Sequence, residues 1–287
     1  MSVYAAAIIA GLCYSLMALG IFISMKIFRI PDITTDGSFT LGAAVTAILL
    51  PEGISAFAAI PFVIIAGAAA GAITGIIHTR LKIDALLSGI LVMTALYSVN
   101  LSIMQRSNIP MLDVHSVFNF IDNQSMLEWL MSAAFALLFA GLIGYILKTD
   151  FGIAMRATGD SESMSKAMGV NTRRMKIAGL AMANALTALS GFLVSQYQGF
   201  ADINMGIGIV ISGLGAVLIG DALTKWMKTT NLWLQLFFVI GGSIVFQLVL
   251  ALALSLGINP NLLKLITAAF VLAIVALPNI SIRRARS

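Results

Sequence analysis

The sequence predicts an all-α polytopic membrane protein with about nine transmembrane helices, and its composition and hydropathy pattern carry that prediction. Hydrophobic residues occupy 60% of the 287 positions and charged residues only 10%, whereas soluble domains carry about 25% charged residues. The apolar residues form long runs, and the charged residues are gathered between these runs. The single cysteine, Cys13, excludes a disulfide framework and a cysteine metal site, so no metal is expected.

Seven apolar runs approach or exceed the roughly 20 residues that cross about 30 Å of hydrocarbon. They cover residues 3–25, 57–78, 85–104, 130–147, 177–197, 232–256 and 262–277. Two shorter runs, 37–50 and 205–220, raise the expected number of crossings to nine. No soluble domain interrupts the runs, so the chain 1–287 is expected to form a single transmembrane domain.

The positively charged residues indicate which way the chain crosses. An odd number of crossings places the termini on opposite sides, and Lys and Arg concentrate on the cytoplasmic side. With the C-terminus inside, only Arg106 and Lys264 of the 17 Lys and Arg residues lie outside. We therefore expect the N-terminus outside and the C-terminus inside. The net charge of +5 then reflects contact with inner-leaflet lipid, and no nucleic-acid partner is needed to explain it.

The first short run, 37–50, follows a polar break at 29–37. Its 14 residues cover about 21 Å at 1.5 Å per residue, which is less than the hydrocarbon thickness. We expect a discontinuous helix that starts inside the membrane, capped by Thr35 or Asp36. Asp32, Thr34, Thr35 and Asp36 are then candidates to line a translocation pathway. The alternative is an inner loop at the headgroups, where Lys26 and Arg29 pair with the two carboxylates.

The second short run, 205–220, enters the membrane from the opposite side. Two short, glycine-interrupted segments of opposite direction are typical of inverted repeats around a central path. Asp202 and Asn204 precede this run and are also candidate pathway residues, although a simple outer loop explains them equally well. The interiors of the long runs lack Asp and Glu, so binding of a coupling cation is not expected.

The longest inner loop, 148–176, contains a candidate short helix. Asp160 or Ser161 can cap it, it runs from Glu162 to Met168, and Gly169 can end it in a left-handed conformation. Its apolar face must be covered, either by a protein partner or by the inner leaflet. That face is formed by Met164, Ala167 and Met168.

Three segments, taken in order, resemble the permease subunit of bacterial ABC importers of the branched-chain amino acid and ribose type. They are PDITTDGSF at 31–39, RATG at 156–159 with AMGVN at 167–171, and GLGAVLIGD at 213–221. The resemblance covers residues 14–277. The first segment is most similar to permeases paired with lipoprotein receptors for amino acids, aromatic ones among them. The Glu-Ala-Ala start of the coupling loop in other importers is replaced by Ser163, Met164 and Ser165.

The resemblance implies a transporter of the bacterial cytoplasmic membrane. Two permeases, expected to be identical, would form the pathway for a small solute, an amino acid, delivered by an extracytoplasmic binding protein. Two ATPase subunits would each bind one coupling helix and drive the permease pair between inward-open and outward-open states. The coupling residues would be Asp160, Ser161, Glu162, Met164, Ala167, Met168 and Gly169. The outer loop 106–128, with Asp113, Asp122 and Glu128, would help to seat the receptor.

This chain is expected to be a translocation subunit and not an enzyme. It has no phosphate-binding Gly-x-x-x-x-Gly-Lys-Ser/Thr loop, so ATP and Mg are expected to bind in a partner. No nucleophile, base or metal set gathers: His78 is interpreted as an anchor at the inner membrane edge and His115 as a surface residue of the outer loop. The alternative function is a stand-alone secondary transporter, which predicts buried acids or histidines in the long spans.

Overall fold

The computed structural model describes residues 3–111, 116–118, 124–259 and 262–284, and all its large elements are helices. Asp113, His115 and Asp122 lie outside the described residues. The helices are α1 (Val3–Ile21), η1 (Phe22–Ile27), α2 (Thr34–Leu49), α3 (Ala56–Arg80), α4 (Ala85–Met104), α5 (Gln124–Lys148), α6 (Asp150–Asp160), α7 (Glu162–Ala167), α8 (Thr172–Gln198), α9 (Ile209–Trp226), α10 (Leu232–Ser255) and α11 (Leu263–Arg284). Two short strands, β1 (Asn108–Pro110) and β2 (Phe200–Asp202), pair antiparallel.

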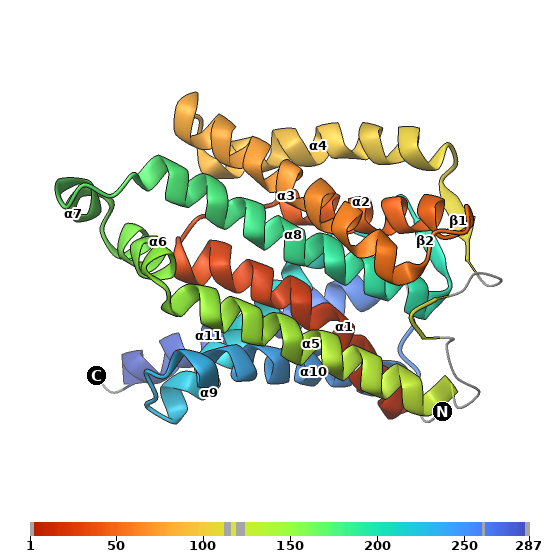
Figure 1. Ribbon diagram of the computed structural model, residues 1–287. Helices are drawn as coiled ribbons and strands as arrows, with labels where there is room; N and C mark the ends of the chain where they lie inside the picture. Colours follow the sequence, from red (N-terminus) through yellow and green to blue (C-terminus); the bar gives the residue numbers. More distant parts are fainter. Residues whose placement is uncertain (1–2, 112–115, 119–123, 260–261, 285–287) are drawn as a thin grey trace.

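Each of the nine apolar runs of the sequence lies in a helix or overlaps one. Seven helices of the described chain are long and apolar enough to cross a membrane: α1 with η1, α3, α4, α5, α8, α9 and α10. The start of α1 and the end of α11 lie at opposite ends of the bundle (Figure 1). The structure therefore agrees with a multi-pass protein, whereas nine crossings and the direction of crossing stay predictions.

The centre of the bundle is formed by α8, which packs against α1, α2 and α3 (Figure 1). Glycines on α3 allow a close approach to this helix: a Cβ added to Gly71 would lie 2.1 Å from the carbonyl oxygen of Leu180. Small residues at helix contacts are typical of membrane proteins, because packing rather than the hydrophobic effect holds helices together in lipid. Among the membrane-length helices of the described chain, α8 and α1 are the most buried, and the shorter α2 is buried against α8, α4 and α3.

The loop at 148–176 contains two helices where the sequence analysis expected one. The additional helix, α6, begins after Thr149, whose hydroxyl accepts a hydrogen bond from the Gly152 N–H. Its buried residues, Gly152, Met155 and Thr158, recur every three positions and face the bundle. That spacing is a helical signal, and it was missed because the run also contains charged residues.

Candidate functional site

The polar break before α2 lies inside the protein. Asp32 and Asp36 are 4% and 7% exposed, so the inner-loop interpretation of these carboxylates is wrong. The cations expected to pair with them have other partners: Lys26 pairs with Asp221, and Arg29 with Asp160 at 3.2 Å. Buried acids must instead find their partners within the bundle.

Asp32 holds the beginning of α2 against α8. Its Oδ1 accepts a hydrogen bond from the Thr34 N–H at 2.9 Å, and its Oδ2 accepts one from Asn184 Nδ2 at 2.7 Å. The helix begins at Thr34, with no side-chain hydrogen bond from the residue at its cap position. The prediction that Thr35 or Asp36 caps this helix is therefore wrong, because both residues lie within its first turn. The carboxylate of Asp32 accepts the hydrogen bond from the N–H of Thr34, the first residue of the helix.

The same polar cluster extends from α8 back to α2 and across to α3. Ser38 donates to Asn184 Oδ1 at 2.7 Å, and the hydroxyls of Thr34 and Thr74 lie 2.7 Å apart. Thr35 donates to the Asp32 carbonyl oxygen at 3.1 Å. Asn184 was not among the residues predicted from the sequence, although an amide in an otherwise apolar span is a usable signal.

Asp36 joins the two short helices. Its Oδ2 accepts a hydrogen bond from the Gly208 N–H at 2.8 Å and its Oδ1 accepts one from the Val210 N–H at 2.9 Å. These N–H groups belong to the beginning of α9. The first N–H groups of a helix have no acceptor within that helix. Asp36 thus caps a helix other than its own, and the two helices meet at their N-termini inside the bundle.

From this meeting point, α2 and α9 run in opposite directions. Later residues of α2, Ala43 and Ala47, pack in one cluster with Met104, Ile109 and Ala201, at the end that carries the β-ribbon. The other helix ends beside η1, where its Asp221 pairs with Lys26. The two short segments therefore have the opposite directions that the sequence predicts, although α9 runs from 209 to 226 rather than from 205 to 220.

Asp202 and Asn204 lie at the β-ribbon and make no hydrogen bond to Asp32 or Asp36. The carboxylate of Asp202 accepts from Asn108 Nδ2 at 3.3 Å and from the Asn204 N–H at 2.8 Å. Both residues shape the turn that leads from β2 to α9. Their role in a pathway, like that of the buried residues before α2, stays a prediction.

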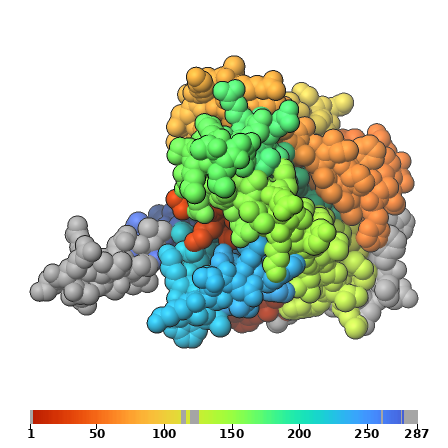
Figure 2. Space-filling model, turned by 60° about the vertical axis from the view of Figure 1, so that its left-hand side comes forward, coloured from red at the N-terminus to blue at the C-terminus, as the bar shows by residue number. Residues whose placement is uncertain are grey.

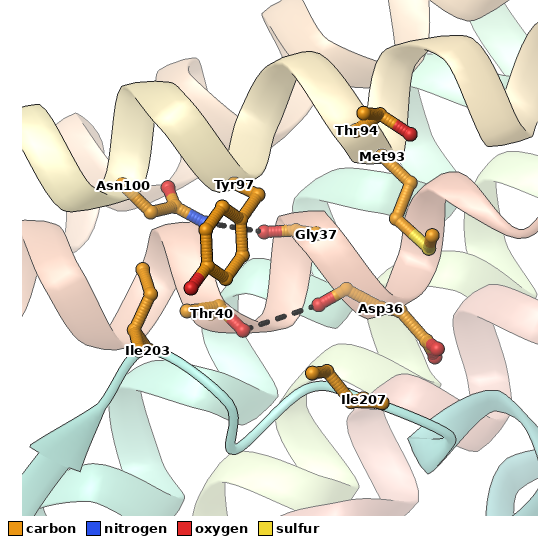
Figure 3. Close-up of a pocket in the computed structure, with 9 residues that line it drawn as sticks. All are labelled: Asp36, Gly37, Thr40, Met93, Thr94, Tyr97, Asn100, Ile203 and Ile207. Carbon is orange, nitrogen blue, oxygen red and sulfur yellow. Dashed lines mark hydrogen bonds between the residues drawn. The ribbon is translucent and has the colours of Figure 1, made fainter. Parts of the chain in front are cut away.

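A cavity of about 250 Å³ lies beside Asp36, between α2, α4 and the turn before α9 (Figure 3). Its lining residues are Asp36, Gly37, Thr40, Met93, Thr94, Tyr97, Asn100, Ile203 and Ile207. Most of this wall is apolar, and the Tyr97 hydroxyl makes no hydrogen bond to a described residue. Asn100 Nδ2 donates to the Gly37 carbonyl oxygen at 3.1 Å, which fixes the orientation of the amide. The cavity is thus small, mostly apolar and edged by a carboxylate.

The short helix of the inner loop is present as predicted. Ser161 Oγ accepts from the Met164 N–H at 3.4 Å, and Gly169 has a φ of +82°, as a left-handed cap requires. Asp160 does not cap this helix, because its carboxylate pairs with Arg29. Met164 and Met168 are 65% and 75% exposed and Ala167 is also exposed, so the apolar face of α7 is uncovered.

Glu162 fixes α7 to the start of α8. Its carboxylate lies 2.8 Å from Lys166 Nζ and 2.6 Å from Lys176 Nζ. Hydrogen bonds from Lys166 and Lys176 lower the pKa of Glu162 to about 2. Glu162 is therefore ionised at neutral pH and the ion pairs persist.

The loop also contacts the bundle through α6. A Cβ added to Gly159 would lie 1.7 Å from the carbonyl oxygen of Ile27, so the backbones of α6 and η1 touch. Since η1 carries Lys26, which pairs with Asp221 of α9, a chain of direct contacts leads from the loop to α9. The hydrogen bond from the Val210 N–H to Asp36 then connects α9 to α2.

A bundle of apolar helices, with two helices that begin in its interior and a cavity at their meeting point, defines a multi-pass membrane protein of the transporter class. The chain belongs to the family described as the branched-chain amino acid transport system / permease component, whose sequence model matches residues 3–276.

Curated relatives extend over most of the chain. It is 41% identical over 275 residues to the tyrosine transport system permease protein of Clostridioides difficile (strain R20291), which covers 95% of this chain and 90% of the relative. It is 37% identical to the uncharacterized protein RP368 of Rickettsia prowazekii (strain Madrid E), over 87% of this chain and 88% of the relative. The ribose import permease protein RbsC of Haemophilus influenzae (strain ATCC 51907 / DSM 11121 / KW20 / Rd) is 26% identical over 66% of this chain and 59% of its own length.

The family assigns the chain its place in a larger assembly. It is the permease subunit of an ABC importer in the inner membrane and not an enzyme, because the ATPase activity of such transporters lies in a separate subunit. Membership of this family implies ATPase and binding-protein partners.

Proposed function

We propose that this chain forms the pathway of an ATP-driven importer for an amino acid, with aromatic amino acids the leading substrate class. The observation that carries the proposal is the meeting of α2 and α9 at Asp36, beside a cavity. Discontinuous helices that meet at mid-depth are typical of transporter binding sites. The 41% identity to a permease named for tyrosine transport supports the substrate class.

The chemistry of the cavity fits an amino acid. Pockets for drug-sized ligands measure about 300–1,000 Å³, so about 250 Å³ suits a smaller solute. The apolar wall, with Met93, Tyr97 and Ile207, suits an apolar or aromatic side chain. Among the described residues that line the cavity none is Lys or Arg, so the wall offers no cation to a bound anion.

Movement would reach this cavity through the contacts that begin at the inner loop. An ATPase would cover the exposed methionines of α7, and closure of the ATPase dimer would move α6 against η1. The pair of Lys26 and Asp221 would pass the displacement to α9, and Asp36 would pass it to α2. Coupling through packed helices with two arrangements is a physical route of this kind. The proposed coupling residues remain Asp160, Ser161, Glu162, Met164, Ala167, Met168 and Gly169.

The proposed assembly contains two copies of this chain, two ATPases and an extracytoplasmic binding protein. In it, the chain crosses the membrane nine times, with its N-terminus outside. Labelling of a cysteine introduced at Ser2 tests this orientation, because an impermeant reagent should reach it in intact cells. Labelling only after the cytosolic face is opened would overturn the nine-crossing topology.

The deciding experiment is purification of the tagged chain in mild detergent, followed by mass determination of the co-purifying subunits. We expect an ATPase in equal copy number, two copies of the chain per complex, and ATP-dependent uptake of tyrosine once the receptor is added. A chain that purifies alone under several gentle conditions, yet transports, would instead favour a secondary transporter. A complex with an ATPase that transports another solute would reject only the substrate class.

A further inference from the structure

A second cavity, of about 310 Å³, lies at the end of the bundle that carries the inner loop. It is open to solvent and bordered by the end of α3, the turn between α3 and α4, α7 and the start of α8. Its lining residues are His78, Thr79, Lys82, Ile83, Asp84, Glu162, Lys166, Arg173 and Lys176. Figure 2 shows this end of the molecule, where the green segment around α7 and the start of α8 borders the orange end of α3.

The lining carries an excess of positive charge. Four Lys and Arg residues face two carboxylates, a difference of +2. Both carboxylates are already occupied: Asp84 Oδ1 accepts from the Leu86 N–H at 2.9 Å and caps α4, and Glu162 pairs with two lysines. Lys82 and Arg173 form no ion pair with a described residue, so their charges are available to an anionic ligand.

The histidine of the cavity is fixed by the turn. His78 Nδ1 lies 2.9 Å from the Ile83 carbonyl oxygen, and since a carbonyl only accepts, Nδ1 donates. Lys82, in the same turn, has a φ of +57°, a left-handed conformation that is uncommon for a residue with a side chain. The turn therefore fixes the backbone at Lys82, which lines the same cavity as His78.

Apolar side chains flank the cavity. Leu81 is 65% exposed, and Leu86 and Leu87 at the start of α4 are 42% and 49% exposed. On α3, Ile76 is also exposed. Since α3 and α4 both have the length and composition of membrane spans, these exposed side chains would face hydrocarbon in a bilayer.

We propose that this cavity binds the headgroup of an anionic phospholipid of the inner leaflet, with its acyl chains against the exposed apolar side chains of α3 and α4. The inner leaflet attracts basic residues near its surface, and basic pockets between transmembrane helices bind anionic headgroups. A free phosphate would use the charges but not the apolar flank. This assignment rests on the proposed orientation, which places α7 in the cytosol.

The lipid would also act on coupling. Glu162 and Lys166 belong to α7 and line the cavity, whereas the exposed Met164 and Met168 do not. A headgroup bound to Lys82 and Arg173 would bridge the α3–α4 turn and the start of α8, directly beside α7. ATP hydrolysis by the complete transporter should therefore depend on anionic lipid.

The test compares two double variants in the complete complex. Lys82→Gln/Arg173→Gln removes the two unpaired charges of the cavity. Arg80→Gln/Lys228→Gln removes two exposed charges on the same side of the protein that do not line the cavity. Native mass spectrometry counts phosphatidylglycerol retained from mixed phosphatidylglycerol and phosphatidylcholine nanodiscs, and the ATP hydrolysis rate is followed against the phosphatidylglycerol fraction.

We expect the cavity variant to retain roughly tenfold less phosphatidylglycerol and to lose the lipid dependence of ATP hydrolysis, while the exposed-charge variant behaves as wild type. Lys82→Arg/Arg173→Lys should restore retention, which separates charge from misfolding. Equal loss in both Gln variants would overturn the site in favour of general surface charge. Displacement of the lipid by millimolar inorganic phosphate would assign a free-anion site instead, and cross-linking of a Lys82→Cys variant to the ATPase would assign the cavity to that protein. Wrong orientation would be revealed separately by labelling at Ser2.

Discussion

The carboxylate of Asp36 accepts a hydrogen bond from the backbone N–H of Val210, with 2.9 Å between Oδ1 and the amide nitrogen. The two residues are 174 positions apart in the chain and belong to the first turns of α2 and α9. A helix N-terminus favours negative charge, so one carboxylate stabilises the ends of both helices. The contact between the beginnings of α2 and α9 thus depends on the carboxylate of Asp36.

Replacing Asp36 should therefore damage both stability and transport. Loss of a helix cap costs about 0.5–2 kcal/mol, and here Asp36→Ala leaves two N–H groups without a partner. Asp36→Asn keeps one acceptor oxygen and should give an intermediate effect. Thermal unfolding in detergent and tyrosine uptake by the reconstituted complex measure the two properties. Glu52→Gln, an exposed acid that does not line the cavity, is the control, and a loss as large as that of Asp36→Ala would refute the central role of Asp36.

Asn184 should be needed to keep Asp32 inside the bundle. Asn184→Ala removes the donor to Asp32 Oδ2 and the acceptor of Ser38, and a buried polar group without a partner costs about 1–3 kcal/mol. A double-mutant cycle with Asp32→Asn, followed by thermal unfolding, should give a coupling energy of about 0.5–3 kcal/mol. Asn204→Ala, at an exposed position, should leave the unfolding temperature unchanged. Additive effects in the cycle would show that the hydrogen bond between the two side chains contributes nothing.

The parts of this fold that depend on local sequence were predictable. Apolar runs mark every membrane helix. In lipid, the backbone N–H and C=O groups of a span must form hydrogen bonds with one another, so each span is one continuous helical segment of the sequence. The limits of α7 followed from Ser161 and Gly169 in the same way, since caps act on neighbouring residues. The short lengths of α2 and α9 indicated helices that begin inside the bundle.

The parts that depend on distant residues were not predictable. Thr35 or Asp36 was expected to cap α2, the helix that contains both. No local rule predicts that the carboxylate oxygens of Asp36 accept hydrogen bonds from the N–H groups of Gly208 and Val210 instead. Asn184 and Tyr97 lie in spans that read as ordinary apolar helices, and only the packing of α8 and α4 against α2 brings them to the site. Lys26 and Arg29 were expected to pair with nearby acids, but the fold buries those acids and offers Asp221 and Asp160 instead.

The ion pairs of Glu162 should make stability depend on pH. The pKa of Glu162 falls from 4.5 to about 2 in the folded protein, so its contribution is fully present above about 4.5 and disappears as the pH falls toward 2. Glu162→Gln should lower the unfolding temperature by a constant amount between pH 7 and 5, and the difference should shrink below that. Glu52→Gln, an exposed acid with no ion pair among the described residues, should show no such difference. If the difference in unfolding temperature between wild type and Glu162→Gln stayed constant down to pH 3, the ion pairs of Glu162 would not be the source of the stabilisation.

The exposed methionines of α7 should be required for binding of the ATPase. Met164→Glu/Met168→Glu places two charges on the apolar face, and burial of an unpaired charge is strongly unfavourable. We expect loss of the ATPase from the complex purified in mild detergent, with the unfolding temperature of the permease unchanged. Met227→Glu is the control, because Met227 is also an exposed methionine, 53% accessible, but lies after α9 and away from α7. Normal recovery of the ATPase with the double variant would show that α7 is not the coupling helix.

Tyr97 should control how well the cavity beside Asp36 accepts its substrate. Its ring forms part of the apolar wall, so Tyr97→Ala removes contact area and should raise KM for tyrosine uptake severalfold, since aromatic pairs contribute about 0.5–1.5 kcal/mol beyond burial. Tyr97→Phe keeps the ring and should separate the effect of the hydroxyl, which is free to bond a solute. Tyr145→Ala removes an equally large side chain, 68% exposed on α5 and outside the cavity, and should leave KM unchanged. If Tyr97→Ala and Tyr145→Ala gave the same KM while the ATPase remained bound, the substrate would have to pass elsewhere, because Tyr97 is the only aromatic residue among the described residues that line the cavity.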